Sequence, residues 1–224
     1  AQDPGTPVAG IIAGQQITDD SIAGIRRDSN FKGAHYGIAP EVNLLYAQVD
    51  EGKNEQDPDE GSQSLSAIED ALDWFSHHDA DIDVVLIESS TARTDALDYN
   101  KDIIFAIQKL RDQGSVVVVP TGNAGNGTGG SPASVYDSFT VGATKSDVRF
   151  EPEIAEFSSG RTIDVSEDWG QVVAKQRDWP EEYIVPDVSA PGSGTVTASA
   201  NAGYCTFSGT SAAGPHVAAT IALM

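Results

Sequence analysis

The sequence predicts an α/β domain of three layers, in which helices cover both faces of a mostly parallel central sheet. Segments with the hydrophobic period of a helix alternate along the chain with short strand-like runs. Helices of this length between strands favour right-handed crossovers, which place the strands parallel in one sheet. The chain has 224 residues, enough for one domain of this class with a sizeable core.

The N-terminal part of the chain is expected to form two helices and two strands. Residues 6–14 predict a short helix rich in small residues, and Pro7 falls in its first turn, where a missing N–H is harmless. The apolar run at 42–49 predicts a strand. Apolar residues at helical spacing predict a helix over 65–75, and the short run at 84–87 predicts a buried strand.

The second half of the chain repeats this alternation. Helical spacing over 103–110 predicts a helix that Gly114 closes just past its end. The β-branched run at 115–119 and the run at 139–141 predict strands, and residues 210–224 predict a final helix. In contrast, mixed charge and two tryptophans at 161–182 favour a surface insertion over a core element.

The charge of the chain restricts its partners. The net charge is −21, from 34 acidic and 13 basic residues. Such a surface repels nucleic acid and anionic membranes, and no apolar run approaches the roughly 18 residues of a membrane span. We therefore expect no nucleic acid partner and no membrane insertion. Few lysines in an acidic chain suit high salt, where screening removes self-repulsion, and favour a halophilic source over an ordinary acidic secreted protein.

The first residues lack the basic start and apolar block of a signal peptide. We expect an extracellular or cell-surface protein whose signal lies outside this chain.

The most specific motif covers residues 207–218, Phe-Ser-Gly-Thr-Ser-Ala-Ala-Gly-Pro-His-Val-Ala. Gly209 permits a tight approach into a helix that is expected to begin near Ser211, with Pro215 in its first turn. A serine there lies beside unpaired N–H groups and the positive end of the helix dipole, which stabilise a developing oxyanion. The local physics alone fits a helix N-cap as well as a nucleophile.

A second motif joins a strand to a glycine-rich loop, Thr-Gly-Asn-Ala-Gly-Asn-Gly at 121–127. A phosphate cradle would need a helix directly after the glycines, and the run Thr-Gly-Gly-Ser-Pro at 128–132 argues against one. Two interpretations remain for Asn123. It is either a turn asparagine or a side-chain amide that donates to an oxyanion.

Both motifs resemble those of the subtilases, which carry Gly-Thr-Ser-x-Ala-x-Pro-His-Val-Ala and Gly-Asn-x-Gly. The resemblance implies that Ser211 is the nucleophile, that Asn123 donates to the oxyanion, and that His216 is structural. It also implies that Gly122 lies in the substrate-binding region. Further segments match the family in order and extend the resemblance over almost the whole chain, with a candidate cis bond before Pro132; they cover 37–47, 131–143, 157–160 and 186–192.

The resemblance breaks at the general base. The family motif His-Gly-Thr-His-Val-Ala-Gly is matched by residues 4–10, except that both histidines are proline. Pro4 stands at the base position and cannot accept a proton. The strand that carries the family's aspartate is absent from the sequence given.

We therefore expect a peptidase domain over residues 1–224 that is truncated at both ends. We expect it to be inactive or severely impaired, but still able to bind peptide. The alternative is an active serine endopeptidase whose base and aspartate come from sequence outside this chain.

The segment after the strand at 84–87 also departs from the family. Subtilases have Ser-Leu-Gly-Gly there, whose backbone pairs with the peptide substrate, whereas this chain has Glu88, Ser89, Ser90 and a threonine. Backbone pairing needs no particular side chain, so a peptide or protein remains the expected ligand. An alternative makes Glu88 a stray base, but acidic relatives with a Ser-Glu-Asp set carry their glutamate on the histidine helix.

No cofactor is expected. The acidic run at 57–60 lacks the regular ligand spacing of a calcium loop and favours a solvated loop over a calcium site.

Overall fold

A five-stranded sheet forms the centre of the protein. The computed structural model describes residues 5–15, 37–49, 65–78, 81–89, 101–145, 152–170, 178–200 and 204–224. The strands of the sheet are β1 (Val84–Leu86), β2 (Val116–Pro120), β3 (Phe139–Lys145), β4 (Glu153–Ile154) and β7 (Val188–Pro191). β1, β2, β3 and β7 are parallel, and β4 is antiparallel to the end of β3. The mostly parallel sheet expected from the sequence is confirmed.

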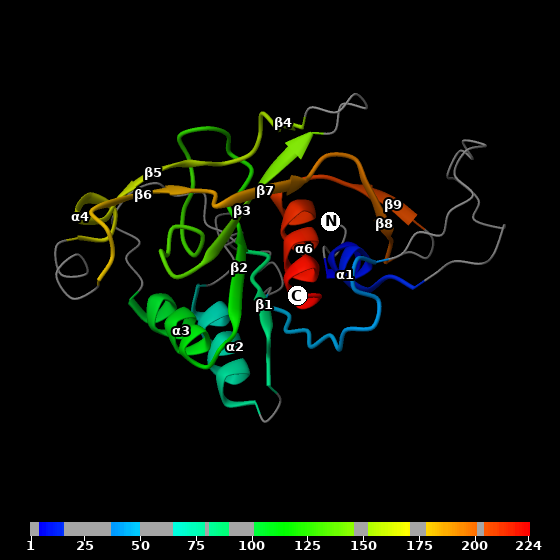
Figure 1. Cartoon of the computed structure of the whole chain (residues 1–224), viewed down its shortest axis with the longest axis horizontal. Coiled ribbons are helices and arrows are strands. Elements are labelled where there is room, and N and C mark those ends of the chain that lie inside the picture. The colour runs from blue at the N-terminus through cyan, green and yellow to red at the C-terminus, as the bar shows by residue number, and fades with distance from the viewer. Residues whose placement is uncertain are drawn as a thin grey trace, which may run out of the picture.

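Helices cover both faces of this sheet (Figure 1). α2 (Leu65–His77) and α3 (Lys101–Asp112) pack together on one face, and α6 (Thr210–Ala222) packs against β1, β2, β3 and β7 on the other. α1 (Gly5–Ala13) lies against α6. The result is the three-layer arrangement that the sequence predicts.

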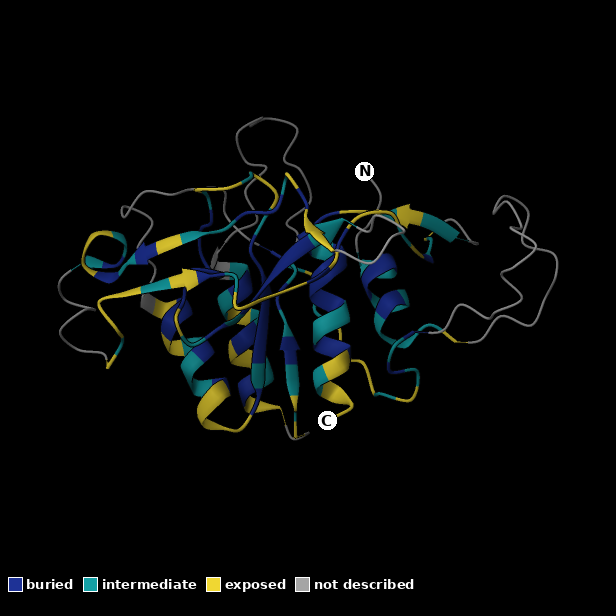
Figure 2. Cartoon of the chain, turned by 45° about the horizontal axis from the view of Figure 1, so that its top comes forward, coloured by how far each residue is buried: buried dark blue, intermediate teal, exposed yellow. Residues whose placement is uncertain are grey.

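Side-chain alternation along β2 builds a separate core on each face. Val117 and Val119 belong to the core beneath α2 and α3, whereas Val118 belongs to the core beneath α6. β1 follows the same rule, since Val85 packs with the first core and Leu86 with the second. Figure 2 shows the middle of the central sheet and the inner sides of the helices as buried, in line with the buried runs of β2 and β3.

The predicted helices are confirmed, and each begins and ends within two residues of its expected position. The expected strand at 42–49 is wrong, because residues 43–49 lie outside any strand and pair with none among the described residues. Three apolar side chains of this segment are exposed, namely Leu44, Leu45 and Tyr46. An apolar run becomes a strand only where a neighbouring strand completes its hydrogen bonds.

The segment expected as a surface insertion contributes to the core. β5 (Arg161–Asp164) pairs with β6 (Glu182–Val185), and α4 (Val165–Asp168) follows β5. Ile163, Val165 and Trp169 are buried in the core beneath α3, so the surface character is wrong for these positions. The prediction rested on the mixed charge of the segment and overlooked its alternating apolar residues, which point into the core. That the segment is an insertion stays a prediction.

A second hairpin leads into the last helix. β8 (Thr195–Ala198) pairs with β9 (Tyr204–Phe207), and Thr197 Oγ1 donates a 2.7 Å hydrogen bond to the Pro7 carbonyl of α1. The expected cis bond at Ser131–Pro132 is present, and Val185–Pro186 is also cis. In the described ranges, no helix is both long enough and apolar enough to cross a membrane.

Candidate active site

Ser211 is the second residue of α6, directly after a tight turn. The Gly209 N–H donates a 2.8 Å hydrogen bond to the carbonyl of Gly192, which follows β7. A methyl group on residue 192 would meet the Ala143 side chain and lie 2.8 Å from the Gly209 carbonyl oxygen. Only glycine therefore lets the sheet approach the turn this closely, and the end of β7 fixes the position of Ser211.

Asn123 is tied to the residue before Ser211. The backbone N–H of Thr210 donates to Asn123 Oδ1 at 2.8 Å, and the Thr210 hydroxyl accepts from the N–H of Gly122 at 3.1 Å. Because an N–H can only donate, the contact with Thr210 assigns the facing atom of the amide as its oxygen. The amide nitrogen of Asn123 is therefore turned away from Thr210 and can donate elsewhere.

The turn at 157–160 holds the asparagine loop in place. The Ser159 hydroxyl accepts from the N–H of Ala124 at 3.0 Å, and the Ser159 N–H donates to the Gly122 carbonyl at 2.9 Å. The Thr121 hydroxyl donates to the Ser159 carbonyl at 2.8 Å. The loop that carries Asn123 is thus bonded on both sides, to this turn and to the start of α6.

At the start of α6, the N–H groups of Thr210 and Ala212 donate to Asn123 Oδ1 and to the Gly209 carbonyl. The first N–H groups of a helix have no partner within it, and they give its N-terminus a partial positive charge. Pro215 was expected in the first turn but is the sixth residue of α6. Its ring lacks the N–H that would bond to the Ser211 carbonyl, so this helix tolerates one missing internal bond.

Glu88 lies against α6 at the carboxyl end of β1. A methyl group on Gly214 would be 3.1 Å from Glu88 Oε1, which places the carboxylate one turn along α6 from Ser211. Both carboxylate oxygens are shielded from solvent, although the residue as a whole is half-buried. Neither oxygen makes a hydrogen bond of regular geometry with the described residues. Burial raises the pKa of Glu88 to about 8, against a smaller lowering by hydrogen bonding with the Ser211 hydroxyl.

The other predicted site residues are less informative. Ser89 is buried just after β1, and Gly122 lies beside Asn123 with its N–H bonded to Thr210. Ser90 and Pro4 lie outside the described residues.

The described histidines lie away from the Ser211 hydroxyl. His216 Nδ1 is 2.7 Å from the Ala212 carbonyl, so this nitrogen carries the proton and donates. Burial lowers the pKa of His216, against a smaller raising effect of that bond. His77 ends α2 on the opposite face of the sheet, where it contacts Asp73, and His78 follows the helix. His35 lies outside the described residues.

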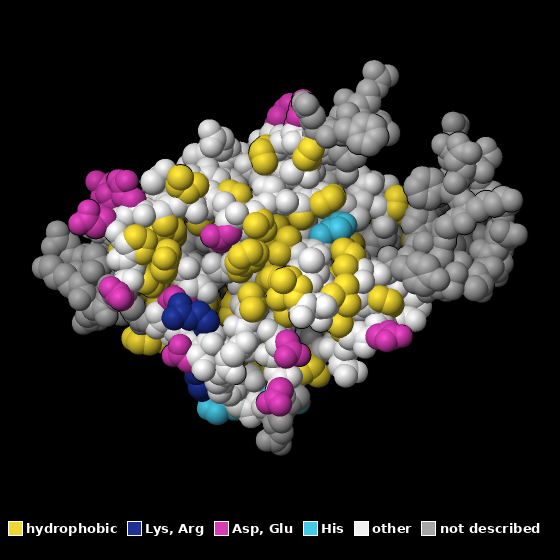
Figure 3. Space-filling view, viewed as in Figure 1, with side chains coloured by type: hydrophobic (Ala, Val, Ile, Leu, Met, Phe, Trp, Pro, Cys, Tyr) yellow, Lys and Arg dark blue, Asp and Glu magenta, His cyan; other side chains and the backbone are white. Residues whose placement is uncertain are grey.

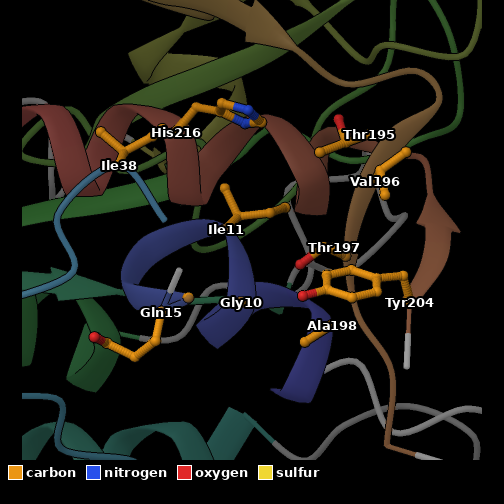
Figure 4. A pocket seen from close by; sticks show the side chains of 11 residues that line it. Gly10, Ile11, Gln15, Ile38, Thr195, Val196, Thr197, Ala198, Tyr204 and His216 are labelled. Carbon is orange, nitrogen blue, oxygen red and sulfur yellow. The ribbon is translucent and has the colours of Figure 1, made fainter. Parts of the chain in front are cut away.

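A separate pocket of about 170 Å³ lies where α1, α6 and the β8–β9 hairpin meet (Figure 4). Its lining includes Ile11 of α1, Gln15 just after that helix, Tyr204 of β9 and His216 of α6. Ser211, Asn123 and Glu88 do not line it. The sequence did not predict this pocket.

The described residues bring no three His, Cys, Asp or Glu side chains together in an arrangement that could hold a metal ion. The acidic run at 57–60 lies outside the described ranges.

The comparison with known families decides the relationship. A sequence model described as the Subtilase family, Peptidase_S8, matches residues 2–224. The chain belongs to the subtilase family. This subtilase is 30% identical over 220 residues to Subtilisin-like protease 2 of Pseudogymnoascus destructans, a match that covers 96% of this chain and 45% of that protein. It is 28% identical over 210 residues to Subtilisin-like protease PopC of Myxococcus xanthus, covering 85% of this chain and 38% of that protein.

A solved structure gives the same answer for the fold. The subtilase is 26% identical, with a TM-score of 0.65, to a cold adapted subtilisin-like serine proteinase, and the match covers 98% of this chain and 60% of the other. The chain therefore spans less than half the length of the two curated relatives and about three fifths of the solved structure.

Sequence reasoning missed the contact between Glu88 and the helix that carries Ser211. The signal was the period of two along β1, because Val84 and Leu86 pack toward α6 and Glu88 comes two residues later. An extended chain continues this alternation past the end of the strand.

Proposed function

We propose that this subtilase domain binds extended peptides at the carboxyl edge of its sheet, with Ser211 as the acyl-transfer nucleophile and Asn123 as the oxyanion donor. We further propose that peptide hydrolysis is severely impaired, because Pro4 stands where a subtilase has its general base. The observation that carries the proposal is the bond from Thr210 to Asn123 Oδ1, which joins the two motifs.

The chemistry follows from these two groups. A peptide carbonyl in front of Ser211 develops negative charge on its oxygen as the hydroxyl adds to its carbon. The Asn123 amide nitrogen donates to that charge, and the positive end of the α6 dipole stabilises it further. Without an imidazole to take the hydroxyl proton, the loss of rate is about 10⁶-fold relative to a complete triad, and about 10³–10⁴-fold over water remains.

The proposed location is extracellular or at the cell surface, and the acidic composition supports a salt-rich environment. A net charge of −21 on 224 residues repels itself at low ionic strength.

The test combines turnover with binding. Cleavage of a mixed fluorogenic peptide set is measured in high salt, beside a subtilase with a complete triad, and binding of the same peptides is followed by fluorescence anisotropy. We expect saturable binding with kcat/KM lower by about 10⁶-fold. Turnover near that of the complete enzyme contradicts the impairment, and absence of peptide binding by folded protein contradicts the proposed function.

A further inference from the structure

The Glu88 carboxylate is the most unusual group in the described part of the chain. Both of its carboxylate oxygens are buried, and neither makes a hydrogen bond of regular geometry with the described residues. A buried carboxyl without a hydrogen bond of regular geometry costs free energy, so a structural role alone does not account for it. Its position beside Ser211 suggests a role toward that hydroxyl.

The geometry aims this carboxyl at the candidate nucleophile. Glu88 follows β1 on the α6 side of the sheet, with Oε1 against Gly214. Ser211 lies three residues before Gly214, and residues three apart lie on the same face of a helix. The Ser211 hydroxyl lowers the pKa of Glu88, which indicates that it faces the carboxyl group, although the contact lacks the geometry of a regular hydrogen bond.

We infer that Glu88 is the catalytic base of this subtilase, accepting the Ser211 proton in place of the missing imidazole. The inference rests on the proposed function of Ser211 as the nucleophile. It gives the impaired site a slow but real route to acyl transfer, through a serine–glutamate pair supplied entirely by the described residues.

The proton and the bonds balance in each step. The Glu88 carboxylate takes the hydroxyl proton while Ser211 Oγ bonds to the peptide carbonyl carbon and the π electrons move to the carbonyl oxygen, which faces the Asn123 amide. Protonated Glu88 then gives this proton to the peptide nitrogen as the C–N bond breaks and the amine leaves. Water then hydrolyses the acyl-enzyme in the same way. It gives a proton to Glu88 as its oxygen adds to the acyl carbon, and Glu88 returns this proton to Ser211 Oγ as the bond to the acyl carbon breaks.

The base is active only as a carboxylate. Burial raises the pKa of Glu88 to about 8, so the group is mostly a neutral acid at pH 7 and becomes a carboxylate above pH 8. Ser211 and Gly214 of α6 face the carboxylate, and Leu86 of β1 and Pro120 of β2 lie around the same point of Gly214; none of these residues carries a charge. The nearest titratable group of the described part of α6 is His216, which is bonded to Ala212 and lines the separate pocket.

The test follows the labelling of Ser211 by a fluorophosphonate between about pH 6 and pH 10 in high salt. Intact-mass spectrometry gives the rate for the wild type, Glu88→Gln, Ser211→Ala and the exposed control Glu156→Gln. We expect a wild-type rate that rises with pH and levels off above about pH 8. Glu88→Gln should label at least about 10²-fold more slowly at the plateau and lose the inflection, while Glu156→Gln should match the wild type.

The outcomes separate the two proposals. Labelling of Ser211 in Glu88→Gln at the wild-type rate, with the same pH profile, overturns the role of Glu88 and leaves the nucleophile in place. No labelling of folded wild-type protein at any pH overturns both the nucleophile and the base. Glu88→Asp keeps a carboxylate on a shorter side chain, and we expect a slower rate with the inflection retained. Loss of the inflection in that variant also counts against the inference.

Discussion

The backbone N–H of Thr210 donates a 2.8 Å hydrogen bond to Oδ1 of Asn123, 87 residues earlier in the chain. This bond joins the glycine-rich loop after β2 to the start of α6. It also orients the amide, because the oxygen is occupied and the nitrogen is turned outward. A single contact therefore sets both the position of the candidate nucleophile and the direction of the candidate oxyanion donor.

Replacement of Asn123 separates these two roles. Asn123→Asp keeps an acceptor for Thr210 but removes the amide donor, whereas Asn123→Ala removes both. We expect both variants to lower fluorophosphonate labelling of Ser211 by about 10²–10³-fold. Only Asn123→Ala should also lose about 1–3 kcal/mol of unfolding free energy in urea, because the Thr210 N–H loses its partner. Wild-type labelling of folded Asn123→Asp would show that the amide is not the donor.

The contact between Gly192 and Gly209 predicts a second effect. Gly192→Ala places a methyl group against Ala143 and the Gly209 carbonyl, so the turn before Ser211 must move. We expect a loss of about 1–3 kcal/mol in unfolding free energy and slower labelling of Ser211. The neighbouring exposed substitution Ser193→Ala is the control and should change neither quantity. Equal stability of the two variants would contradict the tight approach.

The charge distribution predicts stabilisation by salt. Acidic groups outnumber basic ones on the face shown in Figure 3, in line with the net charge of −21. The screening length falls from about 10 Å at 0.1 M salt to about 3 Å at 1 M, so the repulsion between acidic groups weakens over this range. We expect the urea midpoint to rise steadily with sodium chloride. A midpoint that is unchanged or lower at about 1 M salt would argue against the halophilic interpretation.

The raised pKa of Glu88 predicts a pH dependence of stability. The folded-state pKa is about 8 and the ordinary value is 4.5, so the folded protein holds this proton more tightly than the unfolded chain. The stabilisation is complete below about pH 4.5 and is lost as pH rises through about 8, by roughly 5 kcal/mol in total.

Glu88→Gln cannot titrate and should not show this loss. The difference in urea unfolding free energy between Glu88→Gln and the wild type should therefore grow in favour of the variant from about pH 5 to pH 9. The other acidic groups titrate in both proteins, so their contributions to the pH dependence cancel in this difference. A difference that does not change with pH would mean that Glu88 titrates normally.

Much of the fold could be predicted from the sequence, because local periodicity is strong where helices and strands have one buried face. The limits also have physical causes. Residues 43–49 have the apolar character of a strand, but pairing depends on a neighbour that the segment itself cannot specify. Trp169 lies in a charged segment, and its burial depends on contact with the Ser134 carbonyl, 35 residues earlier.

The candidate site was predictable only in part. The motifs identified Ser211 and Asn123 one at a time, but the bridge through Thr210 joins residues far apart in sequence and needed the structure. For Glu88, the alternation along β1 held the signal for its side of the sheet, but this signal was not used to predict the site. The burial of its carboxylate, and thus the raised pKa, depended on what α6 presents there.

The most direct test of the account is a titration of Glu88 itself by carbon-13 NMR of the glutamate side-chain carboxyl groups. We predict that one glutamate titrates near pH 8, that its signal is missing in Glu88→Gln, and that its pKa is higher still in Ser211→Ala, where the hydroxyl no longer lowers it. If every glutamate titrates near 4.5, or if Ser211→Ala leaves the high titration unchanged, the pairing of Glu88 with Ser211 is contradicted.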